Sequence, residues 1–170
     1  ATAEGANTDV DAITNDTIVS QTEYDYDSVG RLIQTTSAKR HDGGTGDGAL
    51  TTSNARLSYN VVWFDDVSRT THSATYGTNG GSAFNRPGTA VEPNSSDDYI
   101  VTKTEFDGYG RTYKVTDNKG IVTATFYDDA NRPIYISENF TDFNPSTEAG
   151  VGGFYGDNED EDRVTKLEYN

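Results

Sequence analysis

Acidic and basic side chains recur at fixed distances along this chain. Four times an aromatic residue is followed by Asp, and Arg stands four positions after that Asp. A positioned carboxylate could take part in acid–base catalysis, but among 28 Asp and Glu residues such pairs arise readily by chance. The four copies are Tyr26-Asp27 with Gly30-Arg31, Phe64-Asp65 with Ser68-Arg69, Phe106-Asp107 with Gly110-Arg111, and Tyr127-Asp128 with Asn131-Arg132.

Repetition favours an architectural role for these residues over a catalytic one. A unique active site needs one set of groups, whereas this set returns in every copy. A carboxylate can accept hydrogen bonds from the backbone N–H two residues on and so close a turn. An arginine can lay its stem over stacked aromatics and pair with carboxylates on neighbouring hairpins. We therefore predict that Asp27, Asp65, Asp107 and Asp128 cap turns and that the protein is not an enzyme.

The remaining candidates for chemistry are two histidines and an acidic run. His41 lies in a Gly-rich loop and His72 in an expected strand, and the sequence indicates no convergent partners for either. Calcium takes six to eight oxygen ligands. The acidic run near the end of the chain supplies carboxylate oxygens, and so do Asp42 and Asp47. No cofactor other than calcium is expected, and its candidate ligands are Asp157, Glu159, Asp160 and Asp162.

The elements that would position the repeated residues are strands. Residues two and four positions before each aromatic share its face in a strand, and most of them are Thr, Val or Tyr, which suit a pleated surface. No segment sustains the spacing of an amphipathic helix. After the Asp, Gly30, Gly110 and Asn131 suit a left-handed turn position. Ser68 fits poorly there, so we expect strain or a different loop.

Each copy therefore predicts a β-hairpin built of strand, turn and strand. The aromatics at 26, 64, 106, 127 and 169 indicate a 21-residue unit, and a separation of 42 residues is either two units or one unit carrying an insertion. We expect stacking to bury the row Tyr26, Phe64, Phe106, Tyr127 and Tyr169, and Trp63 to pack under an insertion. We expect a single domain over residues 1–170, with units near 20–36, 58–73, 100–118 and 121–136, a partial unit at 163–170, and insertions at 37–54, 76–98 and 139–162.

The repeat resembles the YD repeat of the Rhs family, whose signature reads roughly Tyr-Asp-x-x-Gly-Arg-Leu. Residues 24–32 are nearly a full match, and the resemblance covers residues 20–36, 58–73, 100–136 and 163–170. It implies hairpins joined edge to edge in a long sheet, which closes as a shell in toxin carriers and as a barrel in teneurin-like proteins. We predict an all-β fold of antiparallel repeat hairpins that form one twisted sheet or a short β-solenoid.

Composition excludes several classes of protein. A net charge of −15 argues against nucleic-acid binding, which requires a basic face. No apolar stretch reaches the ~20 residues of a membrane helix, and the absence of Cys excludes disulfides and thiol chemistry. An acidic surface fits an extracellular or cell-surface location.

These observations favour a structural protein. We expect a subunit or segment of an extracellular fibre, sheath or surface assembly, built by strand addition between repeat units. The last aromatic, Tyr169, ends the chain in mid-motif, so we expect self-association through chain ends. Two alternatives stay open, namely a glycan- or cell-surface-binding adhesion module and a fragment of a toxin-encapsulating shell.

Overall fold

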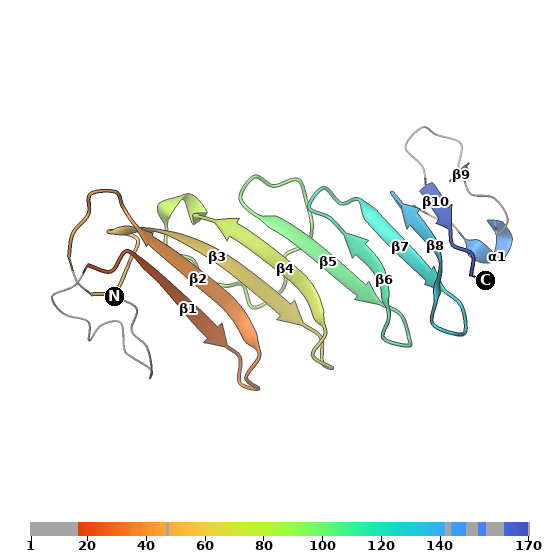
Figure 1. The fold of residues 1–170 in the computed structure, drawn as a ribbon, viewed down its shortest axis with the longest axis horizontal. Helices are drawn as coiled ribbons and strands as arrows, with labels where there is room; N and C mark the ends of the chain where they lie inside the picture. Colours follow the sequence, from red (N-terminus) through yellow and green to blue (C-terminus); the bar gives the residue numbers. More distant parts are fainter. Residues whose placement is uncertain (1–16, 47, 142–143, 149–152, 156–161, 170) are drawn as a thin grey trace. The chain divides into compact units, whose positions relative to one another are not determined.

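The fold is built almost entirely of strands (Figure 1). The computed structural model of the 170-residue chain describes residues 17–46, 48–141, 144–148, 153–155 and 162–169. Helix in these ranges is limited to the 3-10 turn η2 (Asn79–Gly81) and the short α1 (Pro145–Glu148). The strands are β1 (Ser20–Tyr26), β2 (Leu32–Arg40), β3 (Ala55–Phe64), β4 (Thr70–Gly77), β5 (Ile100–Phe106), β6 (Thr112–Thr116), β7 (Val122–Tyr127), β8 (Pro133–Glu138), β9 (Gly153–Tyr155) and β10 (Asp162–Lys166).

The strands form one antiparallel sheet in the order β1-β2-β3-β4-β5-β6-β7-β8-β10-β9. The all-β prediction and the prediction of a single sheet are confirmed. The sheet is open, because β1 and β9 are its end strands and do not pair with each other. The short solenoid is therefore wrong. The chain divides into two compact units, residues 1–62 with 74–88 and residues 63–73 with 89–170.

Four hairpins contain the four complete copies of the motif, and two segments differ from the expected insertions. β2 runs on to Arg40 and pairs with β3 from Ala55 onward, so strands occupy part of the range 37–54. The expected insertion at 139–162 contains α1 and β9, and β9 pairs with β10. These short elements were missed because three or four residues carry too little periodicity to reveal a strand or helix.

Insertions cover one face of the sheet in the first unit. Leu50, from the loop after β2, packs with Ala38 and Ala55 in a buried cluster. Its backbone N–H donates to Oε1 of Gln21 on β1 at 2.9 Å, which satisfies a donor that burial would otherwise leave without a partner. The loop thus supplies the apolar side chain that the strands lack on this face.

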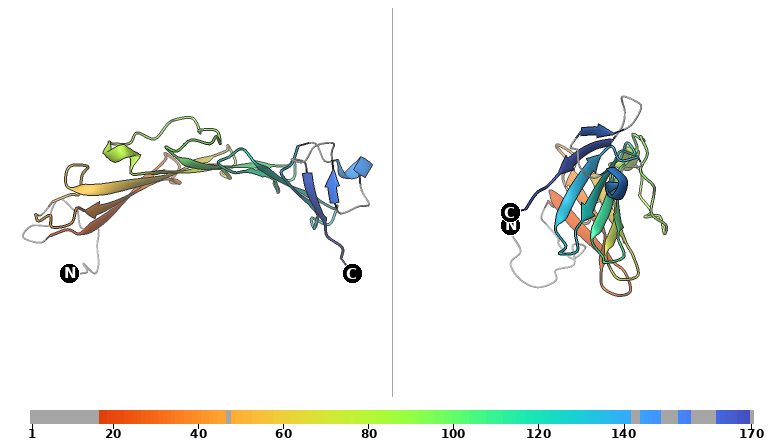
Figure 2. Two further views of the ribbon diagram at one scale, coloured as in Figure 1. Left: turned by 90° about the horizontal axis from the view of Figure 1, so that it is seen from above. Right: turned by 90° about the vertical axis from the view of Figure 1, so that its right-hand side faces the viewer.

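Aromatic contacts hold the segment after β4 against the same unit. The ring of Phe84 lies 5.0 Å from that of Tyr59 and 4.4 Å from that of Tyr76, measured between centroids. Arg86 donates from Nη2 to the carbonyl of Val62 at 2.7 Å. Figure 2 shows η2, at the start of this segment, on one side of β3 and β4. The segment therefore covers the sheet as part of the core.

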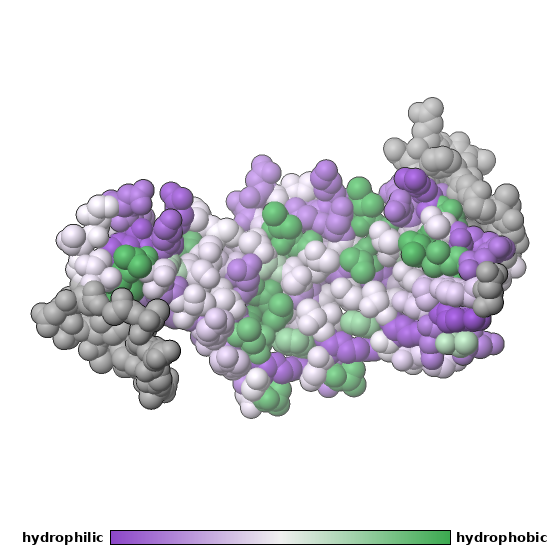
Figure 3. Space-filling model, in the orientation of Figure 1, coloured by the Kyte–Doolittle hydropathy of each residue, from purple (hydrophilic) through white to green (hydrophobic). Residues whose placement is uncertain are grey.

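The buried residues of the second unit include a small apolar cluster and fully buried strand residues. Val101 and Ala124 are fully buried, and Tyr135 and Val164 pack with half-buried Phe126, Ile134 and Phe140. On the face seen in Figure 3, hydrophobic side chains form separate patches with polar ones between them. This pattern agrees with a chain in which 32% of the residues are hydrophobic.

The aromatic row differs from the expectation. Trp63 is buried, with 5% of its surface exposed, and its packing under an insertion stays a prediction. Tyr26 and Tyr169 are 59% and 45% exposed, and the other three members of the row are half-buried. The prediction that stacking buries this row is wrong. Phe106, Tyr127 and Tyr169 each lie under an arginine rather than under another ring, and Tyr26 stays exposed.

All four motif turns have the same backbone. In each turn the Asp N–H donates to the carbonyl of the Arg four residues on, and the residue before that Arg donates back to the Asp carbonyl. That residue is left-handed in every copy, with φ of 84° at Gly30, 67° at Ser68, 83° at Gly110 and 62° at Asn131. A different loop at Ser68 is thus wrong, and the strain that remains is the left-handed backbone of a side-chain-bearing residue.

Replacing Ser68 by Gly should stabilise the protein by about 1 kcal/mol, because Gly adopts positive φ without a steric penalty. The measurement is the free energy of unfolding in urea. The matched control is the reverse change Gly30→Ser, where an added Cβ meets no atom within 4 Å, so the cost is that of the backbone alone. Equal stability of Ser68→Gly and the wild type would contradict the strain.

Candidate functional site: arginine links between hairpins

Each motif Asp uses both carboxylate oxygens inside its own turn. In the third copy, Oδ1 of Asp107 accepts the backbone N–H groups of Tyr109 and Arg111, each at 2.9 Å, and Oδ2 accepts Nε of Arg111 at 2.6 Å. The other three copies repeat this arrangement at Asp27, Asp65 and Asp128. The expectation that the arginines pair with carboxylates of neighbouring hairpins is wrong, because each Arg pairs with the Asp of its own turn.

These bonds stabilise the ionised carboxylates and lower their pKa below the ordinary value of 3.8. The backbone N–H of the following Arg is the largest cause at Asp27 and Asp128. At Asp65 and Asp107 desolvation is the largest single effect and raises the pKa, but the backbone and side-chain bonds from the Arg together outweigh it. The four carboxylates are thus held as anions and are poor candidates for proton transfer at neutral pH.

The guanidinium group reaches beyond its own turn to the next aromatic of the motif. Cζ of Arg111 lies 4.5 Å from the ring centroid of Tyr127, within the range of a cation–π interaction. The same contact joins Arg69 to Phe106 at 4.3 Å and Arg132 to Tyr169 at 4.8 Å. We call each such pair of an Arg and the following motif aromatic an arginine link.

Two further contacts strengthen the links. The hydroxyl of Tyr127 donates to the carbonyl of Thr112 at 2.9 Å, and that of Tyr169 donates to the carbonyl of Pro133 at 2.7 Å. Both acceptors directly follow a linking Arg. The partial copy ending at Tyr169 therefore occupies the same place as a complete one.

In two turns the left-handed residue also lies beside the preceding motif arginine. Nη1 of Arg111 donates to Oδ1 of Asn131 at 3.0 Å and to the carbonyl of Asp128 at 3.3 Å. A Cβ built at Gly110 would lie 3.3 Å from Nη1 of Arg69. The residue before the motif Arg thus meets two constraints: its backbone has a positive φ, and its side chain must fit beside the guanidinium group of the preceding hairpin. Only the first constraint could be inferred from one hairpin.

A cavity of about 240 Å³ lies beside one link and is lined by Asp107, Arg111, Tyr127, Phe126 and Ile134 among others. The polar groups that face it from the motif are already bonded to each other, so they do not form an open acid–base pair. The chemistry of the links is structural: they join one hairpin to the next through a cation, a ring and a carbonyl.

Sequence reasoning missed a fifth turn of the same kind. Asp117, between β6 and β7, accepts the N–H groups of Lys119 and Ile121 through Oδ1, and Gly120 is left-handed with φ of 83°. This turn has no arginine. The spacing of Asp and Gly was visible in the sequence, but without the aromatic and the Arg it did not stand out.

The candidate metal ligands fall into two groups. Asp157, Glu159 and Asp160 lie outside the described residues. Asp162 begins β10, is fully buried, and accepts the backbone N–H of Thr141. Among the described residues, no three His, Cys, Asp or Glu side chains lie close enough together to hold a metal ion. Calcium binding at the acidic run stays a prediction.

The two histidines have different surroundings. His41 is exposed at the end of β2, whereas His72 on β4 is 9% exposed and its Nε2 has no hydrogen-bond partner. Oε1 of Glu92 lies 3.7 Å from that Nε2, and Glu92 also pairs with Lys103 at 2.9 Å. Burial is the largest cause of a lowered pKa at His72; Lys103 lowers it further, while Glu92 and Glu105 act in the opposite direction.

Comparison with models of protein families gave no match, and comparison with the curated proteins gave none either. The similarity to the YD repeat thus remains a prediction from the sequence. In the described part of the chain no helix has the length and apolar character needed to cross a membrane.

A double-mutant cycle should detect an arginine link directly. We expect Arg111→Met and Tyr127→Leu to show a coupling of about 1 kcal/mol in the free energy of unfolding, as for a partly desolvated cation–π pair. The matched control is the exposed pair Arg163 and Glu138, 3.7 Å apart, in a cycle of Arg163→Met and Glu138→Gln, where we expect coupling near zero. Equal coupling in the two cycles would show that the link contributes nothing special.

His72 should make the stability depend on pH. Because its folded-state pKa is below 6.5, the unfolded chain binds the proton first as the pH falls, and stability is lost from about pH 6.5 down through the folded pKa. We expect His72→Gln to flatten this part of the curve, measured by urea unfolding between pH 7 and 5. The exposed His41→Gln is the control and should keep the wild-type slope. An unchanged slope in His72→Gln would refute the assignment.

Proposed function

We propose that this protein is a non-enzymatic structural protein, a subunit or segment of an extracellular fibre, sheath or surface assembly that is built by strand addition between repeat units of the YD type. The observation that carries the proposal is the first strand. β1 has the position of a motif strand and ends in a motif aromatic, but nothing described lies on its outer edge.

Tyr26 at the end of β1 has the place that Tyr127 and Tyr169 have in later copies. Each of those two rings lies under a guanidinium group, and its hydroxyl group donates to a backbone carbonyl. No described residue contacts the ring or hydroxyl of Tyr26 in this way, and the side chain is 59% exposed. If an added unit placed a motif arginine over the ring of Tyr26, the two residues would form a further arginine link.

The unpaired edge of β1 is the second support. An edge strand presents a row of free N–H and C=O groups, and strand addition satisfies them with main-chain hydrogen bonds. At the other end of the order, the end strand β9 has three residues and so presents fewer backbone groups than the seven-residue β1. We therefore propose β1 as the edge where another unit joins. Residues 1–16 lie outside the described residues.

A second candidate function is supported by two exposed rings. Tyr24 and Tyr26 alternate along β1, so they share a face, and they are 55% and 59% exposed. Neighbouring aromatic rings on one face are the type of platform that stacks on sugars. An adhesion module that binds glycans through this pair is the alternative, with an extracellular or cell-surface location in either case.

Strand addition predicts concentration-dependent assembly of the purified chain. We expect sedimentation velocity to show oligomers that grow with concentration and electron microscopy to show filaments. Tyr26→Ala should weaken assembly, because it removes the ring of the missing link. Tyr109→Ala is the matched control: this tyrosine is 86% exposed at a turn tip, and its loss should leave assembly unchanged.

A wild-type chain that stays monomeric at all concentrations would contradict the structural proposal. Glycan binding by that monomer, lost in both Tyr24→Ala and Tyr26→Ala and kept in Tyr109→Ala, would support the adhesion module in its place.

A further inference from the structure

Most cationic side chains of this acidic protein contact a partner within the chain, and three described ones do not. The chain has 13 Lys and Arg residues, and most of their side chains contact a carboxylate, a backbone carbonyl or an aromatic ring. Among the described residues only Lys39, Arg56 and Lys119 have no such partner. The engaged ones are Arg31, Arg40, Arg69, Arg86, Lys103, Arg111, Lys114, Arg132, Arg163 and Lys166.

Two of the three exceptions lie directly opposite each other. Lys39 on β2 and Arg56 on β3 are partners in the strand register, and both side chains are exposed. Like charges directly opposite on one face of an antiparallel pair are destabilising. The protein has a net charge of −15, so carboxylates are plentiful. Even so, no described carboxylate forms an ion pair with Lys39 or Arg56.

Arg56 lines two small cavities in the first unit, and Lys39 lines the smaller of them. One, of about 240 Å³, is lined by His41, Thr52, Ala55, Arg56, Leu57, Thr78 and Gly81. The other, of about 120 Å³, is lined by Lys39, Arg40, His41, Asp42 and Arg56. His41 and Arg56 line both, so the cavities adjoin.

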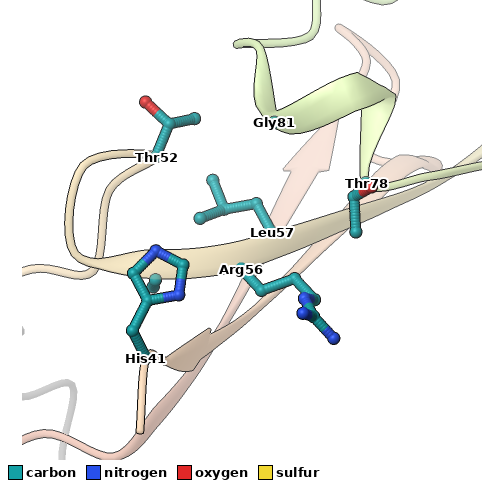
Figure 4. A pocket seen from close by; sticks show the side chains of 7 residues that line it. His41, Thr52, Arg56, Leu57, Thr78 and Gly81 are labelled. Atoms are coloured by element: carbon teal, nitrogen blue, oxygen red, sulfur yellow. The ribbon is translucent and has the colours of Figure 1, made fainter. Parts of the chain in front are cut away.

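Figure 4 shows how these residues lie around β3. Leu57 extends from the strand toward the loop that carries Thr52 and the turn that carries Gly81, whereas the guanidinium group of Arg56 extends to the other side. Thr52 and Thr78 line the larger cavity. Leu57 and the cationic group of Arg56 therefore lie on opposite sides of β3, and Arg56 shares the smaller cavity with Lys39.

We propose that this corner of the first unit is a binding site for an oxyanion, a carboxylate or sulfate group carried by a small ligand such as an acidic sugar. Arg56 and Lys39 supply the charge, with Arg56 able to bind both oxygens of one group through its planar fork. His41, which lines both cavities, supplies a further hydrogen bond. Arg40 takes no direct part, because it donates to the carbonyls of Ile18 and Gly46.

Volume and charge define the class of ligand. Pockets for drug-sized molecules have volumes of roughly 300–1,000 Å³, so cavities of about 240 and 120 Å³ suit one ionic group with a small carrier. Asp42 lines the smaller cavity as well and opposes an anion. Its removal should therefore strengthen binding, whereas a cation site would lose affinity. The site does not depend on the proposed assembly, because it lies on strands already paired within one chain.

The test is a titration of the full chain with sulfate and with galacturonate, at constant ionic strength maintained with chloride, followed by backbone amide NMR shifts. We expect saturable shifts at residues 39–42, 52–57 and 78–81. Arg56→Ala should weaken binding at least about tenfold, Lys39→Ala less, and Asp42→Asn should strengthen it. The matched control, Lys119→Ala, removes the third exposed cation and should leave affinity unchanged.

Three outcomes would overturn the proposal. The first is the absence of shifts in these segments with either anion. The second is equal weakening by Lys119→Ala, which would indicate only a general charge effect. The third is weaker binding in Asp42→Asn, which would indicate a cation. Galactose, which lacks the carboxylate of galacturonate, separates recognition of the charged group from recognition of the sugar ring. Shifts with galacturonate and sulfate but not with galactose support the oxyanion site, and equal shifts with galactose contradict it. The amide spectrum of each variant also shows whether it is folded.

Discussion

The structure depends on a single side chain performing two tasks at once. Each motif arginine is fixed by the Asp of its own turn, and the guanidinium groups of Arg69, Arg111 and Arg132 lie over the aromatic of the next motif strand. Because Nε is held by a carboxylate while Nη1 and the planar face remain available, the group can bond to a neighbouring hairpin. Lysine could not replace it, since a single ammonium group lacks the fork and the flat face.

This arrangement explains how a chain with few apolar residues maintains a long sheet. Two of the buried clusters are small, and in each the strands pack with a residue from an insertion, Leu50 in one and Phe140 in the other. The links between hairpins place a cation over a ring, and in two of them a tyrosine hydroxyl also donates to a carbonyl. Such contacts tolerate partial exposure better than a hydrophobic core does, because their polar groups remain satisfied in water.

The same logic relates the repeats to the proposed function. A link joins an arginine to the ring that follows it, so a series of hairpins has a direction, and the first ring in the series has no arginine before it. Tyr26 is that ring, on a strand whose outer edge is unpaired. The insertions differ in role from the hairpins. They fold over one face of the first unit and leave at its corner a small cavity bordered by Arg56 and His41, where chemistry unrelated to the repeat can reside.

The sequence by itself determined the strands, the turns and the single antiparallel sheet. These features depend on neighbours in the chain: side chains alternate along a strand, and an Asp bonds to backbone groups two and four residues away. Even Ser68, which does not suit its position, adopts the common turn, because the bonds around it outweigh the cost of a left-handed backbone. Only the tertiary structure decided that the sheet is open, that β9 pairs with β10, and that Leu50 packs on Ala38 and Ala55. It also decided the partner of each arginine. The sequence pattern suggested carboxylates of neighbouring hairpins, whereas Arg111 pairs with Asp107 of its own turn, and only the packed sheet brings Tyr127 and Asn131 against it. Contacts between residues distant in the chain depend on which strands are adjacent and in which register, and no local pattern specifies either.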